Sequence, residues 1–152
     1  SEGRGYANLT EIGGLDWVQF GINSNDNSEF HMIRKQQSQE QQEYIGNIST
    51  SSSAVYTYSN NVRAFYWNDG AQDMRVLSEA NASTFGVYID GGEFALNVNN
   101  LKGGNVYKLR VCVGVWQNRG SMHAELKVGA DSTSFVDSTL YAADGTVDVE
   151  YE

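Results

Sequence analysis

The stretch from Tyr107 to Val128 constrains the fold of this chain more than any other. Two runs in which apolar residues alternate with polar or small ones flank a turn sequence, Gln117-Asn118-Arg119-Gly120. The apolar positions are Tyr107, Leu109, Val111, Val113 and Val115 in the first run, and Met122, Ala124, Leu126 and Val128 in the second. A period of two is typical of a strand with one buried face. We therefore predict a long β-hairpin whose apolar face must be covered by another sheet.

The length and composition of the chain are those of one all-β domain. The chain has 152 residues, no proline, 16 glycines and nine tyrosines, and this length suffices for a sizeable core. We expect residues 1–152 to form a single domain, with residues 1–5 as a loose N-terminal segment.

Short apolar or alternating runs recur between turns rich in Gly, Asn and Ser. The strands predicted outside the hairpin are 6–12, 15–20, 30–35, 44–48, 54–58, 62–67, 85–89, 94–98, 131–136 and 146–151. Residues 71–81 carry the only passable helical pattern and fit an irregular connection equally well. About ten short strands with frequent turns predict an all-β fold, a single-domain antiparallel β-sandwich or jelly roll.

Charge and cysteine content narrow the classes of partner. The net charge of −9 argues against nucleic acid or an anionic membrane, because neither offers counter-charge to an acidic surface. No apolar run reaches the ~20 residues that a membrane-spanning helix needs, so membrane insertion is not expected. Cys112 is the only cysteine, which excludes an internal disulfide, and we expect it to be a small, partly buried apolar residue.

Three N-glycosylation sequons, at Asn8, Asn47 and Asn81, fit a secreted protein. Chance also produces such triplets in a chain this rich in Asn and Ser. The chain begins at Ser1 without a signal-peptide pattern, so we interpret it as a mature or excised segment. An extracellular or cell-surface location, with possible glycosylation at the three sequons, is the resulting expectation.

No catalytic signature is present. The two histidines, His31 and His123, belong to no Ser-His-Asp set or HExxH motif, and the chain has no glycine-rich phosphate loop. Glycoside hydrolysis needs two carboxylates at a set separation, and nothing in the spacing of the aspartates selects a pair. Asp16 and Asp137 fit another role, in which they accept backbone N–H bonds at turns or strand ends. We predict a protein that is not an enzyme.

One loop has a weak calcium-binding pattern. Asn23, Asn25, Asn27 and Glu29 recur at every second residue, as ligands do in some calcium loops. The EF-hand pattern also requires a first aspartate and a central glycine, and both are absent. A solvated loop is the simpler interpretation, and calcium is the only cofactor that the sequence suggests.

Aromatic residues are the better functional signal. Their faces stack on the C–H faces of sugars, while neighbouring Asn, Gln and Asp side chains can bind the hydroxyl groups. The candidate ligand or interface aromatics are Trp116, Tyr66, Tyr88, Tyr56 and Tyr58. Each could instead belong to the core, because aromatic side chains dominate such interiors. We assign Trp17 and Trp67 to the core and expect Trp116, at the hairpin tip, to be the most exposed.

Several segments together resemble a family of extracellular, carbohydrate-binding-module-like β-sandwich domains of bacterial secreted and surface proteins. The segments are Leu15-Asp16-Trp17 with Gly21, Phe65–Gly70, Gly86-Val87-Tyr88, Tyr107–Val111, Val113–Trp116 and Asp137–Leu140. They occur in the order of the family and span most of the chain. The resemblance implies a non-catalytic sandwich, often accessory to polysaccharide-active or surface proteins, and supplies no catalytic residue.

Two departures from the family pattern matter. A second aromatic pair that family members often carry after Trp17 is replaced by Val18-Gln19-Phe20, which weakens a ligand platform there. Family members also continue with a further closing strand past the segment that matches Thr146–Tyr151, whereas this sequence ends at Glu152. We therefore expect an open edge at the last strand, which carries Val147, Val149 and Tyr151, and an open edge invites pairing with another chain.

Two non-enzymatic functions follow from these observations. In the first, the protein is a structural subunit of a surface filament or array, and its copies join by β-strand complementation and aromatic contacts. In the second, it is a carbohydrate-binding module that recognises a polysaccharide through exposed aromatic residues. The expected partner is accordingly a second copy of the chain or a polysaccharide.

Overall fold

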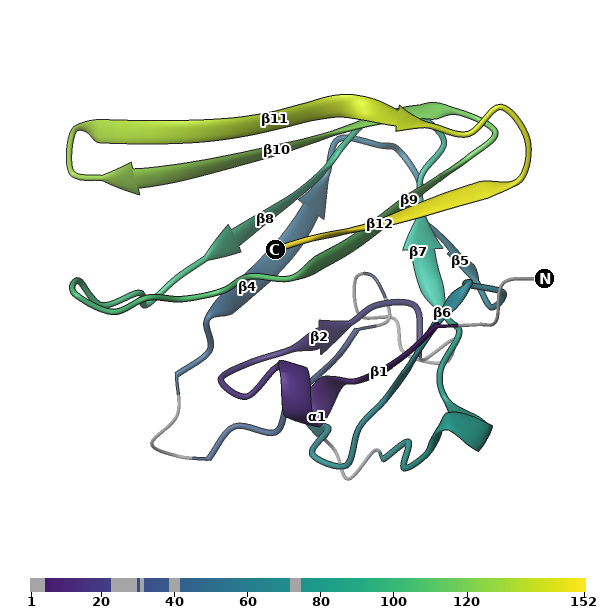
Figure 1. Cartoon of the computed structure of the whole chain (residues 1–152), viewed down its shortest axis with the longest axis horizontal. Helices are drawn as coiled ribbons and strands as arrows, with labels where there is room; N and C mark the ends of the chain where they lie inside the picture. Colours follow the sequence, from purple (N-terminus) through teal and green to yellow (C-terminus); the bar gives the residue numbers. More distant parts are fainter. Residues whose placement is uncertain (1–4, 23–29, 31, 39–41, 72–74) are drawn as a thin grey trace. The chain divides into compact units, whose positions relative to one another are not determined.

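The computed structural model describes residues 5–22, 30, 32–38, 42–71 and 75–152. Its contacts divide the chain into two compact units, Ser1–Asn105 (unit 1) and Val106–Glu152 (unit 2). Strands predominate in both, which confirms an all-β protein (Figure 1). The expectation of a single domain remains a prediction.

Unit 1 is built from small, open ladders of two strands each. Its strands are β1 (Gly5–Asn8), β2 (Val18–Gln19), β3 (Ile33–Arg34), β4 (Ile45–Thr50), β5 (Tyr56–Tyr58), β6 (Arg63–Tyr66), β7 (Gly86–Tyr88) and β8 (Phe94–Val98). Strand β2 pairs with β3, β4 with β8 and β5 with β7, all antiparallel. Strands β1 and β6 are parallel, which departs from the purely antiparallel prediction. The long sequence between them permits this, because a parallel pair needs a crossover of roughly a dozen residues or more.

The two helical segments of unit 1 differ from the expected elements. The predicted strand 6–12 ends at Asn8, and α1 (Leu9–Ile12) follows as one helical turn. The Asn8 side chain accepts a hydrogen bond from the Thr10 N–H at 3.2 Å, and such a cap favours a helix start over a continuing strand. In 71–81 residues 72–74 lie outside the described residues, and Glu79–Asn81 forms the 3₁₀ turn η3.

A small aromatic core holds unit 1 together. Its buried residues are Leu9, Trp17, Ile33, Phe65 and Trp67. The rings of Trp17 and Trp67 lie 5.2 Å apart between centroids, and only 3% and 1% of these residues is exposed. The prediction that both belong to the core is confirmed.

A polar centre at Asp69 adjoins this core. The Asp69 carboxylate accepts hydrogen bonds from the Thr10 hydroxyl at 2.7 Å and from Trp17 Nε1 at 3.0 Å, and it forms a salt bridge with the buried Lys35. Burial raises the pKa of Asp69, but the hydrogen bonds from Lys35, Thr10 and Trp17 outweigh it and hold the pKa below its usual value of 3.8. One carboxylate therefore ties together segments that follow β1, β3 and β6 and precede β2.

Asp16 has the structural role that the sequence predicts. Its Oδ2 accepts the backbone N–H groups of Tyr44 and Ile45, both at 2.9 Å, and Oδ1 accepts the Gln37 amide at 3.1 Å. The carboxylate thus satisfies two donors where β4 begins.

Unit 2 is one long hairpin folded back on itself (Figure 1). Its strands are β9 (Val111–Trp116), β10 (Arg119–Val128), β11 (Asp131–Tyr141) and β12 (Thr146–Tyr151). Strand β10 pairs with β11 and β9 pairs with β12, both antiparallel. The hairpin turn therefore lies between β10 and β11, and the expected hairpin of 107–128 with its turn at 117–120 is wrong.

The predicted turn sequence forms a bend, after which the chain continues away from β9. Gln117 has a φ of 48°, and its N–H donates to the Gly145 carbonyl at 3.0 Å, while Ala142 N–H donates to the Asn118 carbonyl at 2.9 Å. The partner strand thus bends at the same place and follows β9–β10 through the turn. Alternation in sequence identifies a strand but not its partner, because pairing is non-local.

The inner faces of the two arms pack near the bend. A Cβ on Gly120 would lie 2.7 Å from Val115 Cγ1, so only glycine allows the arms to approach this closely. Leu140 and Ala142 are the buried residues of unit 2, with 6% and 3% exposed. Within β9, Val111, Val113 and Val115 are half-buried, whereas Cys112 is exposed and not partly buried as expected.

We predict that Asp69→Asn lowers the free energy of unfolding by about 2–4 kcal/mol, because the buried Lys35 ammonium loses its counter-charge. Urea denaturation followed by tryptophan fluorescence measures this change. The double variant Lys35→Met/Asp69→Asn should lose less than Asp69→Asn alone, because no buried charge is then left unpaired. An equal loss in both variants would contradict this account.

The same centre predicts acid sensitivity. Since the folded-state pKa of Asp69 is lowered, its contribution is complete above pH 3.8 and disappears as the pH falls through the folded value. The melting temperature of the wild type should therefore drop more steeply below about pH 4 than that of Asp69→Asn. If the melting temperatures of the wild type and Asp69→Asn fall with pH at the same rate, Asp69 does not contribute to acid sensitivity.

Candidate functional site

The structure brings together three of the five candidate aromatics. Tyr56 and Tyr58 lie on β5, Tyr88 lies opposite Tyr56 on β7, and these three residues form what we call the tyrosine cluster. Tyr66 is half-buried in β6, where it pairs with Asn8. Trp116 belongs to unit 2.

The tyrosine cluster is an exposed cross-strand arrangement of rings. Tyr56 and Tyr88 are stacked, with centroids 5.2 Å apart and planes inclined by 27°, and 47% and 46% of these residues is exposed. Tyr58 meets Tyr88 edge-on at 6.2 Å. Because the rings pack on one another, they do not form the flat platform that a sugar ring would stack on.

Gly86 makes the cluster possible. It lies opposite Tyr58, and a Cβ there would come within 2.5 Å of the Tyr58 ring. The glycine therefore leaves the space that the Tyr58 ring occupies. The backbone of Gly21 also lies close to Gly86: a Cβ on Gly21 would lie 2.3 Å from the Gly86 carbonyl oxygen. The absence of a side chain at Gly21 therefore permits this close approach of the two backbone segments.

The bend of unit 2 presents a second aromatic group on its outer side. Trp116 is 68% exposed at the end of β9, as expected from its position. Across the bend, Tyr141 is 51% exposed and carries the Arg119 guanidinium 4.6 Å from its ring centroid. Both point away from the inner face of Val115, Gly120 and Leu140. Sequence reasoning missed Tyr141, because its role depends on the pairing of β11 with β10.

The predicted edge strand exists as β12. Val147, Val149 and Tyr151 lie opposite Val115, Val113 and Val111 of β9, and Val149 and Tyr151 are half-buried. Within the part of the chain that the structure describes, no third strand pairs with β9 or β12. Each of these two strands therefore has one edge along which no other described strand pairs.

Tyr151 joins the two arms of unit 2. Its hydroxyl donates to Asp137 Oδ2 at 2.6 Å, and its ring meets Phe135 edge-on at 6.1 Å. Asp137 Oδ1 accepts the Thr139 backbone N–H at 2.8 Å, which confirms its expected role. The bond to Asp137 raises the pKa of Tyr151 to about 12, while the Thr139 and Tyr151 bonds lower the pKa of Asp137.

Ion pairs hold the segment before β9 against the end of β12. Arg110 Nη2 lies 2.8 Å from Glu152 Oε2 and its Nε lies 4.0 Å from Glu150, and Lys108 also pairs with Glu152. Hydrogen bonding by Lys108 and the charges of Lys108 and Arg110 lower the pKa of Glu152. The basic residues just before β9 thus form ion pairs with the acidic residues at the end of β12.

The arm formed by β10 and β11 exposes apolar side chains beyond its contact with Tyr151. Leu126 and Val128 share one face with Phe135, and 52%, 68% and 54% of these residues is exposed. The expectation that another sheet covers the apolar face of 107–128 therefore fails over this part of the arm within the described chain.

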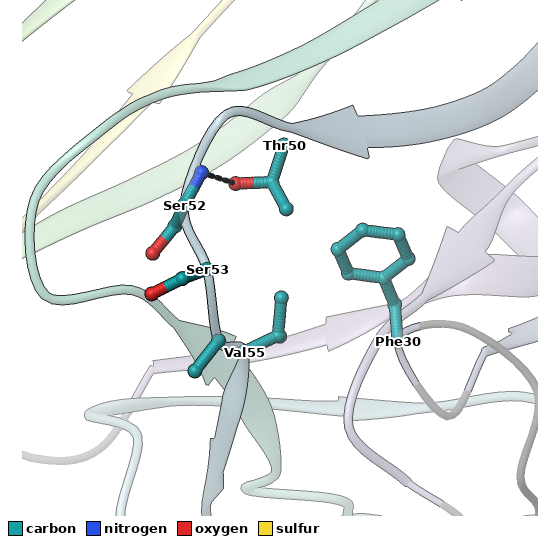
Figure 2. Close-up of a pocket in the computed structure, with 6 residues that line it drawn as sticks. Phe30, Thr50, Ser52, Ser53 and Val55 are labelled. Atoms are coloured by element: carbon teal, nitrogen blue, oxygen red, sulfur yellow. Dashed lines mark hydrogen bonds between the residues drawn. The ribbon is translucent and has the colours of Figure 1, made fainter.

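A hollow of about 240 Å³ lies in unit 1, where Phe30 faces the segment 50–55 (Figure 2). Its lining residues are Phe30, Thr50, Ser52, Ser53, Ala54 and Val55. The Thr50 hydroxyl is already used, since it accepts the Ser52 N–H at 3.0 Å and donates to the Glu93 carbonyl at 2.8 Å. Ligand pockets usually enclose about 300–1,000 Å³, so this hollow is smaller than most of them.

The remaining sequence candidates are distributed as follows. The calcium-loop residues Asn23, Asn25, Asn27 and Glu29 lie outside the described residues. Elsewhere, in the part that is described, no group of three or more His, Cys, Asp or Glu side chains could hold a metal ion.

The three sequon asparagines occupy different environments. Asn47 is exposed on β4, whereas Asn8 caps α1 and Asn81 Oδ1 accepts the Ser78 N–H at 3.1 Å. No helix among the described residues is long and apolar enough to cross a bilayer.

Comparison with models of known protein families, with curated proteins and with solved structures finds no match to this chain.

Replacing Tyr151 with Phe should remove the link to Asp137 while the ring still packs on Phe135. Because the folded-state pKa is raised, the bond stabilises the fold fully below pH 10 and is lost as the pH rises to about 12. The Phe variant should melt at a lower temperature than the wild type at neutral pH. This difference in melting temperature should vanish as the pH rises to about 12.

Ultraviolet titration of tyrosinate supplies the direct readout. One tyrosine of the wild type should ionise near pH 12, and Asp137→Asn should return it towards 10. An unchanged titration curve in Asp137→Asn would refute the assignment.

Proposed function

We propose that this protein is a non-catalytic, extracellular structural subunit whose copies assemble by β-strand complementation. The observation that carries the proposal is the pair of open edges on the β9–β12 ladder. Unpaired strand edges are ready templates for another strand, and natural proteins usually cover or blunt them.

Charge complementarity supports a head-to-tail arrangement of copies. Strand β12 carries Asp148 and Glu150, so two β12 strands placed side by side would bring like charges together. The flank of β9 carries Arg110, which already pairs with Glu150 and Glu152 inside one chain. The β12 edge of one copy therefore fits the β9 edge of the next, and repetition of this contact gives an open filament.

Added strands would also enlarge the small ladders. In this proposal the complete molecule is a β-sandwich or jelly roll, as the family resemblance implies, and strands from neighbours complete its sheets. Leu126, Val128 and Phe135 would then be covered in the assembly, which removes apolar surface from water. In this proposal the protein binds a second copy of itself and needs no cofactor.

We expect the native protein to form regular filaments in electron micrographs and to elute as polymer in size-exclusion chromatography with light scattering. Asp148→Pro and Val149→Pro form a matched pair, because successive residues of a strand direct their N–H groups to opposite edges. The proline that replaces the residue whose N–H faces β9 should remove a ladder hydrogen bond and lower the melting temperature. The proline that replaces the residue whose N–H faces the open edge should leave the melting temperature unchanged and abolish assembly.

Two outcomes would refute the assembly proposal. The first is a monodisperse monomer at all concentrations, and the second is a fully assembled variant pair. Glu93→Gln, on an unrelated loop of unit 1, serves as the control that should leave assembly unchanged.

A carbohydrate-binding module is the second candidate function, and the exposed Trp116 favours it. Trp116 is exposed at the end of β9, and the Arg119 guanidinium lies over the Tyr141 ring on the other arm of the bend. An exposed indole face can stack on a sugar ring. The net charge of −9 favours a neutral glycan over an anionic one.

If this second function holds, the protein should be retained on an insoluble neutral polysaccharide, and Trp116→Ala should weaken retention by about tenfold or more. Trp116→Phe should restore part of it, because an aromatic face remains. Affinity electrophoresis measures the retardation, and equal migration of the wild type and Trp116→Ala would exclude this site.

A further inference from the structure

We propose that Tyr56 and Tyr88 form a site of oxidative cross-linking, at which a one-electron oxidant of the peroxidase class joins the two rings as dityrosine within one chain. This modification is independent of the proposed assembly and goes beyond it. The inference rests on the stacked, exposed ring pair across β5 and β7.

The ladder holds the two rings where a carbon–carbon bond between them can form. Tyr56 and Tyr88 are direct cross-strand partners, and such neighbours have Cβ atoms about 4.5–5.5 Å apart. Their ring centroids are 5.2 Å apart and their planes are inclined by 27°. Rotation of the two side chains about their own torsions would bring the ortho carbons together.

Both rings are also accessible to solvent. Nearly half of each residue is exposed, so an oxidant can remove one electron from each phenol and water can accept the proton. Two tyrosyl radicals then couple through their ortho carbons, and each ring loses its ortho hydrogen as a proton when aromaticity returns. With hydrogen peroxide as the terminal oxidant, two tyrosines and one peroxide give one dityrosine and two waters.

Other exposed tyrosines lack this arrangement. Tyr6 and Tyr141 are 45% and 51% exposed, yet no other described aromatic ring lies against either of them. Tyr58 meets Tyr88 edge-on at 6.2 Å and packs over Gly86, so it is the less favourable partner. Exposure alone therefore does not select the site, whereas the stacked pair does.

The cross-link would stabilise the short β5–β7 ladder by joining its two strands covalently. Strands β5 and β7 pair through only three residue pairs, and a ladder of two strands is marginal by itself. A covalent bond across it restricts the unfolded chain between residues 56 and 88, as a disulfide would. Such a cross-link suits an oxidising environment and a chain that has one cysteine.

The test treats the full chain at about 10 µM with peroxidase and one equivalent of hydrogen peroxide. A neighbour held at an effective concentration of about 1 mM or more should favour coupling within the chain by about a hundredfold. We expect a monomeric product that lacks two hydrogen atoms and shows dityrosine fluorescence. Proteolysis should release one peptide pair joined through Tyr56 and Tyr88.

Three variants decide the assignment. Tyr56→Phe and Tyr88→Phe keep the stacked rings and should abolish the monomeric product, whereas Tyr58→Phe should retain it. Circular dichroism verifies that each variant is folded. The proposal is overturned if Tyr88→Phe still yields the product, if the link joins Tyr58, or if oxidation yields only dimers between chains. Since the readout is the monomer mass, a failure of filament assembly leaves the result interpretable.

Discussion

Backbone hydrogen bonding at strand edges is the constraint on which the rest of this structure depends. Each described ladder contains two strands, and single bridges such as Phe65–Ser83 and Trp67–Val76 add to them. A two-stranded ladder is marginally stable in water and needs further contacts. The protein supplies part of these contacts through side chains.

Three carboxylates supply contacts that wide sheets would otherwise provide. Asp69 joins loops of unit 1 through Thr10, Trp17 and Lys35, Asp16 accepts the N–H groups at the start of β4, and Asp137 receives the Tyr151 hydroxyl. Hydrogen bonds to a charged acceptor are roughly twice as strong as neutral ones. This explains how an acidic chain can use its aspartates as structural links.

Unit 2 carries the features on which both proposed functions rest. The folded hairpin brings Val115, Gly120 and Leu140 together on the inside, so its outer side and its edges remain for other molecules. The outer side carries Trp116, Arg119 and Tyr141, whereas the edges belong to β9 and β12. A glycan and a neighbouring copy would thus contact different parts of the same unit.

Local patterns in the sequence predicted the position of several strands and the identity of some buried side chains. Strands β8 and β12 have the predicted bounds, Trp17 and Trp67 are in the core, and Asp16 and Asp137 bind backbone donors, because alternation and polarity act over a few residues. Tertiary structure alone decided that β9 pairs with β12, that 117–118 is a bend, and that Tyr56 stacks on Tyr88. These features depend on contacts between residues far apart in the chain, and a period of two is the same whichever strand is the partner.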